Sequence, residues 1–349
     1  MPDALILSRD ELLRSHDYAT AQVEAGYRLH GGFLSDGRYA SPRTLVRTPA
    51  VERWAEALLD RGGTLIDVSR GILPTETWPS YAQSKLLLEA GLDRTFWTSL
   101  TTTGIIEARG AALCTITPPD FQPLVAEDLS GTLTGHLAKG LLWAHGADEG
   151  GDPTDRSIGA HDVMWFAARD MVFAKDLYPT PEVDRVARTE PERQMPQIPA
   201  EHENLVKFLM SVLVVEVRAE SFFAHCCQLL RDPGLFVDRR DRAEHAATIV
   251  ERIRQDEAIH VRYLQVFVSE LRQLMFAGAR GGSVKGAAFI DPIWDRVRGF
   301  VQPERRRIMH DAIKAETQHK LEPDKAARLL AEFDALEGEI EPGKARAAA

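Results

Sequence analysis

The chain has 349 residues, 44% of them hydrophobic and 27% charged, which is enough to bury one large core or two modest ones. Its formal net charge of -10 argues against a nucleic-acid groove, which needs an excess of clustered lysine and arginine. The start of the chain lacks a secretory signal and no stretch approaches ~20 apolar residues, so a cytoplasmic protein without a membrane anchor is expected.

The first 92 residues are predicted to form a helical cap. Ser8 and Glu11 have the spacing of a capping box, which predicts a helix that runs toward Arg28. Two more helices are expected at about 50–59 and 81–89, each followed by glycine. Alternation of period two, the pattern of a strand, is hard to find anywhere in the chain.

Four long segments with apolar residues at helical spacing follow, and they predict an all-α fold with a four-helix bundle over residues 93–276. They cover about 95–114, 129–178 with an interruption, 201–230 and 240–274. At 1.5 Å per residue, the last two would be roughly 45 to 50 Å long. Residues 277–336 are expected to add shorter helices at about 292–300, 303–319 and 323–336, and residues 337–349 a disordered tail.

The cysteines show no pattern of a disulfide framework or a zinc site. Cys226 and Cys227 are adjacent, and Cys114 is the only other one. All three are expected to be reduced and structural.

The fourth long segment contains a carboxylate and an imidazole one helical turn apart. Glu257 and His260 are three residues apart, and apolar residues share or flank their face of the helix, so both should point into the core. A buried carboxylate and imidazole without a charge partner are costly, and a cation is the usual remedy. Taken alone, this Glu-x-x-His spacing is a weak signal.

The second segment echoes this pattern. Asp148-Glu149-Gly150-Gly151, joined to His161 by removal of residues 152–160, parallels Asp256-Glu257-Ala258-Ile259-His260. Pro153 and Gly159 would let the nine residues leave the helix as a loop. Two other readings stay open: Glu149 and His161 could cap helix ends, or Asp152 could replace His161 as the ligand.

A dinuclear bundle site needs one carboxylate from each of the other two helices. Glu107 is the only acidic residue of its apolar stretch, although a surface ion pair beside Arg109 is an alternative. In the third segment Glu216 lies closer to the level of Glu257, and Glu220, one turn further on, is kept as an additional residue of the site or an alternative ligand. His225 points to another side of the helix and is not expected to bind metal.

The combined pattern resembles the ferritin-like di-iron carboxylate superfamily, which includes ribonucleotide reductase small subunits, acyl-carrier-protein desaturases, bacterial multicomponent monooxygenases and arylamine N-oxygenases. The closest match is the run from Arg254 to His260, where Asp256 would support the ligands, and the Asp148–Asp170 region is similar to a branch that oxidises nitrogen in hydrazine- or azoxy-forming pathways. The resemblance covers about residues 95–275, and the inserted loop departs from it. It implies a metal site made of Glu107, Glu149, His161, Glu216, Glu257 and His260, with Glu220 and Asp256 as catalytic residues.

Mixed carboxylate and imidazole ligands suit iron or manganese, and two divalent cations would neutralise four carboxylates. The resemblance implies two iron ions that activate O₂ to oxidise a small organic substrate, with an external electron donor and a homodimer. Asp148 and Asp256 could accept the far N–H of a ligand histidine, or could be ordinary solvated charges. The substrate candidates are an amine, a hydrazine or hydroxylamine, and an aliphatic C–H or fatty-acyl group. An iron store and a metal-free helical scaffold are the competing interpretations.

Overall fold

The computed structural model describes residues 5–69, 79–183, 193–277, 281–299 and 303–336, with side chains from residue 306 in the last range. Most of these residues are helical, as the sequence predicts. The strands in this part of the chain form three separate two-stranded antiparallel sheets. The predicted disordered tail, 337–349, lies outside the described residues.

The N-terminal segment is only partly helical. Its helices are α1 (Arg9–Leu12), α2 (Arg47–Asp60) and α3 (Tyr81–Glu89), and between α1 and α2 lie two hairpins, β1 (Gln22–Glu24) with β2 (Tyr27–Leu29) and β3 (Gly32–Phe33) with β4 (Tyr39–Ala40). The predictions of helices at 50–59 and 81–89 are confirmed within three residues at each end.

The prediction of a first helix that runs toward Arg28 is wrong. The capping box of Ser8 and Glu11 forms, but α1 ends at Leu12. Further on, Ala25 and Gly26 take positive φ angles of 50° and 83°, which reverse the chain directly between β1 and β2. A two-residue reversal of this kind favours strand pairing, which here replaces the second half of the predicted helix.

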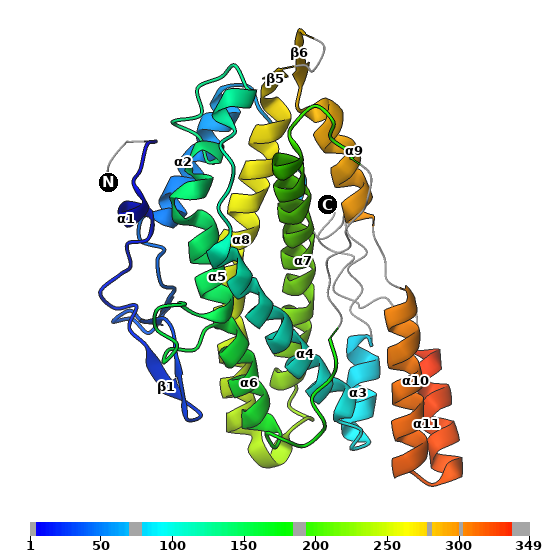
Figure 1. The fold of residues 1–349 in the computed structure, drawn as a ribbon. Helices are drawn as coiled ribbons and strands as arrows, with labels where there is room; N and C mark the ends of the chain where they lie inside the picture. The colour runs from blue at the N-terminus through cyan, green and yellow to red at the C-terminus, as the bar shows by residue number, and fades with distance from the viewer. Residues whose placement is uncertain (1–4, 70–78, 184–192, 278–280, 300–302, 337–349) are drawn as a thin grey trace.

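Four long helical stretches run side by side in the middle of the molecule (Figure 1). They are α4 (Arg94–Gly110), the broken pair α5 (Leu142–Gly150) and α6 (His161–Val172), α7 (Ala200–Arg231), and α8 (Arg240–Gln273). The first, third and fourth match the predicted segments within four residues at each end. The second ends at Val172 instead of about 178, and it begins with short turns instead of an α-helix. These are the 3₁₀ helix Thr134–His136 and the π-helical turn Leu137–Leu141. Two further 3₁₀ helices, Ala111–Thr115 and Gln122–Leu124, follow α4.

Two apolar cores lie one after the other along these helices. On α8 one core contains residues between Ala243 and Ile253, and the other contains residues between Ile259 and Leu274. On α7 the division falls between Val217 and Phe223. A layer of buried polar side chains sits at this junction, where apolar residues on both sides screen it from water.

The C-terminal part packs against both ends of this arrangement. The hairpin β5 (Met275–Ala277) and β6 (Ser283–Lys285) leads into α9 (Ala287–Arg298), which contacts α7 and α8. Helices α10 (Pro303–Lys320) and α11 (Pro323–Ala335) lie beside α3 and share a small core with it (Figure 1). None of the described helices is long and apolar enough to cross a membrane. The proposed divisions at residues 92 and 276 stay predictions.

Candidate metal centre

The six residues predicted to bind metal meet in the polar layer, and all six are buried. They come from all four long stretches: Glu107 from α4, Glu149 from α5, His161 from α6, Glu216 from α7, and Glu257 and His260 from α8. His161 is the first residue of α6, twelve positions after Glu149. The described loop between them therefore brings the imidazole back beside the carboxylate, as the sequence pattern predicts.

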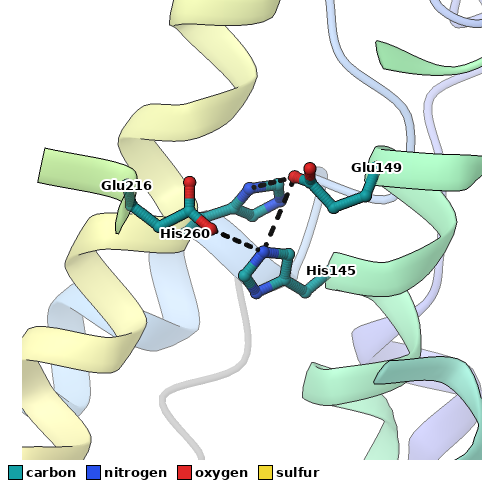
Figure 2. Close-up of side chains that lie close together, drawn as sticks. All are labelled: His145, Glu149, Glu216 and His260. Atoms are coloured by element: carbon teal, nitrogen blue, oxygen red, sulfur yellow. Dashed lines mark hydrogen bonds and ion pairs between the residues drawn. The ribbon is translucent and has the colours of Figure 1, made fainter. Parts of the chain in front are cut away.

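Four side chains form one half of the centre, called site 1 here: His145, Glu149, Glu216 and His260 (Figure 2). His145 Nε2 lies 3.1 Å from Glu216 Oε1 and 3.6 Å from Glu149 Oε1. His260 Nδ1 lies 3.1 Å from the same Glu149 oxygen. The two imidazole rings stack with their centroids 3.8 Å apart. Two nitrogens and several carboxylate oxygens thus face one small volume.

Glu107, Glu149, His161 and Glu257 form the other half, site 2. His161 Nδ1 is 3.0 Å from Glu257 Oε1, 3.3 Å from Glu149 Oε1 and 4.0 Å from Glu107 Oε2. The second oxygen of Glu257, Oε2, is 2.8 Å from His260 Nδ1 of site 1. Glu149 and Glu257 therefore contact both halves, which is the arrangement of carboxylates that bridge two cations.

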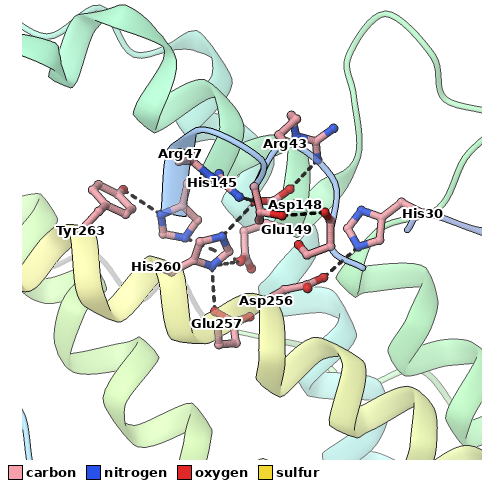
Figure 3. A network of polar contacts seen from close by, with 12 residues as sticks. His30, Arg43, Arg47, His145, Asp148, Glu149, Asp256, Glu257, His260 and Tyr263 are labelled. Atoms are coloured by element: carbon pink, nitrogen blue, oxygen red, sulfur yellow. Dashed lines mark hydrogen bonds and ion pairs between the residues drawn. The ribbon is translucent and has the colours of Figure 1, made fainter. Parts of the chain in front are cut away.

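The far nitrogen of each of the three imidazoles contacts a buried polar group (Figure 3). His260 Nε2 lies 3.2 Å from Asp148 Oδ2, and His161 Nε2 lies 3.2 Å from Asp256 Oδ2. His145 Nδ1 lies 2.8 Å from the hydroxyl of Tyr263. Such contacts fix the orientation of a metal-binding histidine and choose which nitrogen faces the metal. Asp148 and Asp256 are thus not solvated charges.

Burial and charge shift the acid–base behaviour of these groups strongly. Burial, and next the charge of Glu149, raises the pKa of Glu107 well above its usual value. Burial also raises the pKa of Glu216, with Glu257 adding to the effect. Burial opposes the protonation of His260, yet the charge of Glu257 and hydrogen bonds hold its pKa well above the usual value. The negative charge of the cluster therefore favours protonation of these groups. Bound cations would neutralise the same negative charge.

The burial and chemical type of the donor atoms indicate whether a cation fits between them. Glu149 Oε1, Glu257 Oε1 and His161 Nδ1 are fully buried and make no hydrogen bond, although His161 Nδ1 lies 3.3 and 3.0 Å from the two oxygens. Unpaired buried polar atoms are costly, and all three belong to the residues that line site 2. Oxygen and imidazole donors without thiolates match iron or manganese better than structural zinc. The residues therefore fit a pair of such ions.

Three other residues weighed from the sequence lie away from the cluster. Glu220, predicted to be catalytic, forms a bidentate ion pair with Arg254, with distances of 2.9 and 2.6 Å. Asp152 accepts hydrogen bonds from Thr154, in the loop. His225 faces Ser84, 3.3 Å from its hydroxyl. Asp256, also predicted to be catalytic, lies behind His161, and together with His30 and His161 it forms a third buried group whose atoms could hold a cation.

Sequence reasoning missed two histidines of this region. His145 lies four residues before Glu149, so both side chains share one face of α5; this spacing was the available signal. His30 follows β2, and its Nε2 lies 3.3 Å from Asp256 Oδ2. Nothing near His30 in the sequence indicates a metal site.

His30 reaches Asp256 because the inserted loop pairs with the N-terminal segment. The backbone N–H of His30 donates to the carbonyl of Gly159 (2.8 Å), and the N–H of Gly159 donates to the carbonyl of Arg28 (2.8 Å). Residues 153–157 of the loop are exposed, so the insertion bulges outward as predicted.

A hollow of about 670 Å³ opens beside the centre. Phe33 and Tyr39 border it on one side, and the outer face of α8, from Thr248 to Gln265, borders it on the other. Glu257 is among the residues that line it, together with Glu220 and Arg254.

No family model, no curated protein and no solved structure matches this chain. The buried carboxylates and imidazoles of the two sites are groups that could hold metal ions.

Proposed function

We propose that this protein is a non-heme di-iron oxidase or oxygenase, built on a ferritin-like four-helix bundle of α4, α5 with α6, α7 and α8. The observation that carries the proposal is the contact of Glu149 and Glu257 with both halves of the cluster. Carboxylates shared in this way hold two metal ions close enough to act on one O₂ molecule.

Polar residues of the cluster would bind the metal ions, and the apolar residues around it would exclude water. Glu107 and His161 would hold one ion, and His145, Glu216 and His260 the other, with Glu149 and Glu257 between them. Bound ferrous ions would supply electrons to O₂. The two apolar cores on either side keep bulk water from the centre, which protects a strong oxidant from side reactions.

The lining of the hollow beside Glu257 favours a small substrate with both a polar and an apolar group. Charged and amide side chains such as Arg254, Gln255 and Glu220 line it together with Phe33 and Tyr39. A fatty chain would need a dry, enclosed tunnel, whereas this lining suits an amine or hydrazine that carries a compact apolar group. We therefore propose N-oxidation as the reaction, and an external donor for the electrons that two ferrous ions do not supply.

Anaerobic iron loading followed by O₂ tests the proposal. We expect about two iron ions per chain, and rapid O₂ uptake at an oxygen electrode when the ferrous protein is mixed with air-saturated buffer. Protein loaded with zinc, which has no redox chemistry, is the control and should take up none. Accumulation of many iron ions per chain would identify a store, and absence of bound metal would identify a scaffold.

A further inference from the structure

Two buried carboxylates stand behind the candidate ligands, and their surroundings differ. Asp148 lies behind His260 and Asp256 behind His161, with the same oxygen-to-nitrogen distance of 3.2 Å. Both are completely buried. Their other hydrogen-bond and ion-pair partners come from residues 30–47 of the N-terminal segment, which wraps around the bundle.

Asp148 is surrounded by positive charge (Figure 3). Arg47 Nη2 lies 2.6 Å from its Oδ2, and Arg43 contacts its Oδ1. Arg43 has a φ of 56°, in the left-handed region that side chains disfavour. The chain accepts this conformation at the residue that brings a second guanidinium to Asp148.

The negative charge of Asp256 is not neutralised in this way. The hydroxyl of Tyr39 donates to its Oδ2 (2.9 Å) and His30 approaches the same oxygen, but neither carries a permanent positive charge. Within the described ranges, no arginine or lysine forms an ion pair with Asp256. The guanidinium of Arg252, beside the Tyr39 ring, is instead paired with Glu24 and the carbonyl of His30.

The two halves of the centre therefore differ in charge and in donors. Behind site 1 stand one carboxylate and two guanidiniums, whereas a carboxylate without a fixed cation stands behind site 2. Site 1 offers two imidazoles and site 2 offers one. A hard divalent cation binds more tightly where the surroundings are more negative and richer in oxygen.

We propose that Arg43 and Arg47 weaken cation binding at site 1, so that site 2 fills first and the metal at site 1 is the one that exchanges. This inference rests on the proposed dinuclear centre. The two arginines act through Asp148 and His260, as tuning residues that do not touch the metal.

Titration of the metal-free full-length protein with Mn²⁺ tests the first part, because free Mn²⁺ is counted directly by its EPR signal. We expect two classes of site whose dissociation constants differ by about tenfold or more. Glu107→Ala should weaken the tight class, and His145→Ala the loose class. Two equal sites in the wild-type protein would overturn the inference and leave the dinuclear centre intact, whereas no bound Mn²⁺ would overturn the centre itself.

The role of the arginines is tested by whether the affinity of the loose class for Mn²⁺ rises or falls when Arg43 is replaced. Arg43→Gln removes one positive charge from a partly exposed side chain and should tighten the loose class by about tenfold, while Arg43→Lys should keep it near the wild-type value. If Arg43 only held Asp148 in place, Arg43→Gln would weaken that class, and this result would overturn the proposal. Arg38→Gln is the matched control, because Arg38 is exposed and paired with Asp36.

Discussion

Gly110 shows how tightly a single residue is constrained around the centre. A Cβ atom at this position would lie 2.5 Å from both Cβ and Cγ of Glu149, closer than real side chains approach. The backbone at Gly110 is otherwise helical, with a φ of -58°, and would accept any residue. The missing side chain is thus required by the packing of Glu149 against the end of α4.

Gly110→Ala should therefore push Glu149 away from the other ligands. Alanine favours helix by about 1 kcal/mol over glycine, but overpacking of this kind costs about 1–3 kcal/mol. We expect a net loss of stability in urea unfolding together with weaker metal binding. Gly131→Ala is the control, because its Cβ would meet its nearest neighbour, Leu5, at an ordinary 3.5 Å. Equal behaviour of the two variants would contradict the packing argument.

His225 gives a prediction about pH that is separate from the metal centre. Burial lowers its pKa to about 4, and the hydroxyl of Ser84 lies 3.3 Å from its Nε2. The unfolded chain takes up a proton near pH 6.5, where the folded chain does not, so stability falls as the pH drops from about 6.5 toward 4.

We expect His225→Gln to lose about 2–3 kcal/mol less stability than the wild-type protein between about pH 7 and pH 4.5, because glutamine does not titrate. Urea unfolding of the metal-free proteins at both pH values measures this difference. The carboxylates of the centre titrate in both proteins and cancel in the comparison. Parallel loss in the two proteins would show that His225 is not held neutral.

At the scale of elements, the break between α5 and α6 determines whether His161 or Asp152 joins Glu149 as a ligand from this stretch. The structure places His161 in site 2 and leaves Asp152 in a turn with Thr154. His161→Ala should therefore reduce bound iron from about two to about one per chain, since it removes the only imidazole of site 2. Asp152→Ala should keep both, as measured by metal analysis. The reverse pattern would make Asp152 the ligand.

The helices could be predicted well because their signals are local. Apolar spacing over more than 30 residues marks α7 and α8, and Ser80 and Gln83 cap α3 in the same way that Ser8 and Glu11 cap α1. The hairpins were missed because strands of two or three residues are too short to show alternation. Gly26 and Gly37, which lie in the turns of the two hairpins, are a local signal in the sequence, but many other glycines also lie in turns.

For the molecule as a whole, the site was predictable where a repeated motif and helix geometry agree. Glu149, Glu257 and His260 follow from the Asp-Glu-x-x-His echo, and His161 follows once the loop is removed. Tyr39, Arg43 and His30 could not be predicted, because only the wrapping of the N-terminal segment around α5 and α8 brings them there. The choice between Glu216 and Glu220 also needed the structure, which pairs Glu220 with Arg254.

Metal binding should stabilise the whole fold, because four buried carboxylates from the long helices meet in one cluster and repel one another. A ligand that binds only the folded chain adds about 2.7 kcal/mol when its concentration is 100 times its dissociation constant. We expect Mn²⁺ to raise the Tm of the metal-free protein by several degrees in a thermal scan. Glu257→Ala removes a carboxylate that contacts both sites, so it should abolish most of this shift and at least one bound ion. The control is Glu220→Ala, because Glu220 lies on the neighbouring helix but outside the cluster, and this variant should retain the full shift in Tm. A shift in Glu257→Ala equal to that of the wild-type protein would rule out Glu257 as a shared ligand.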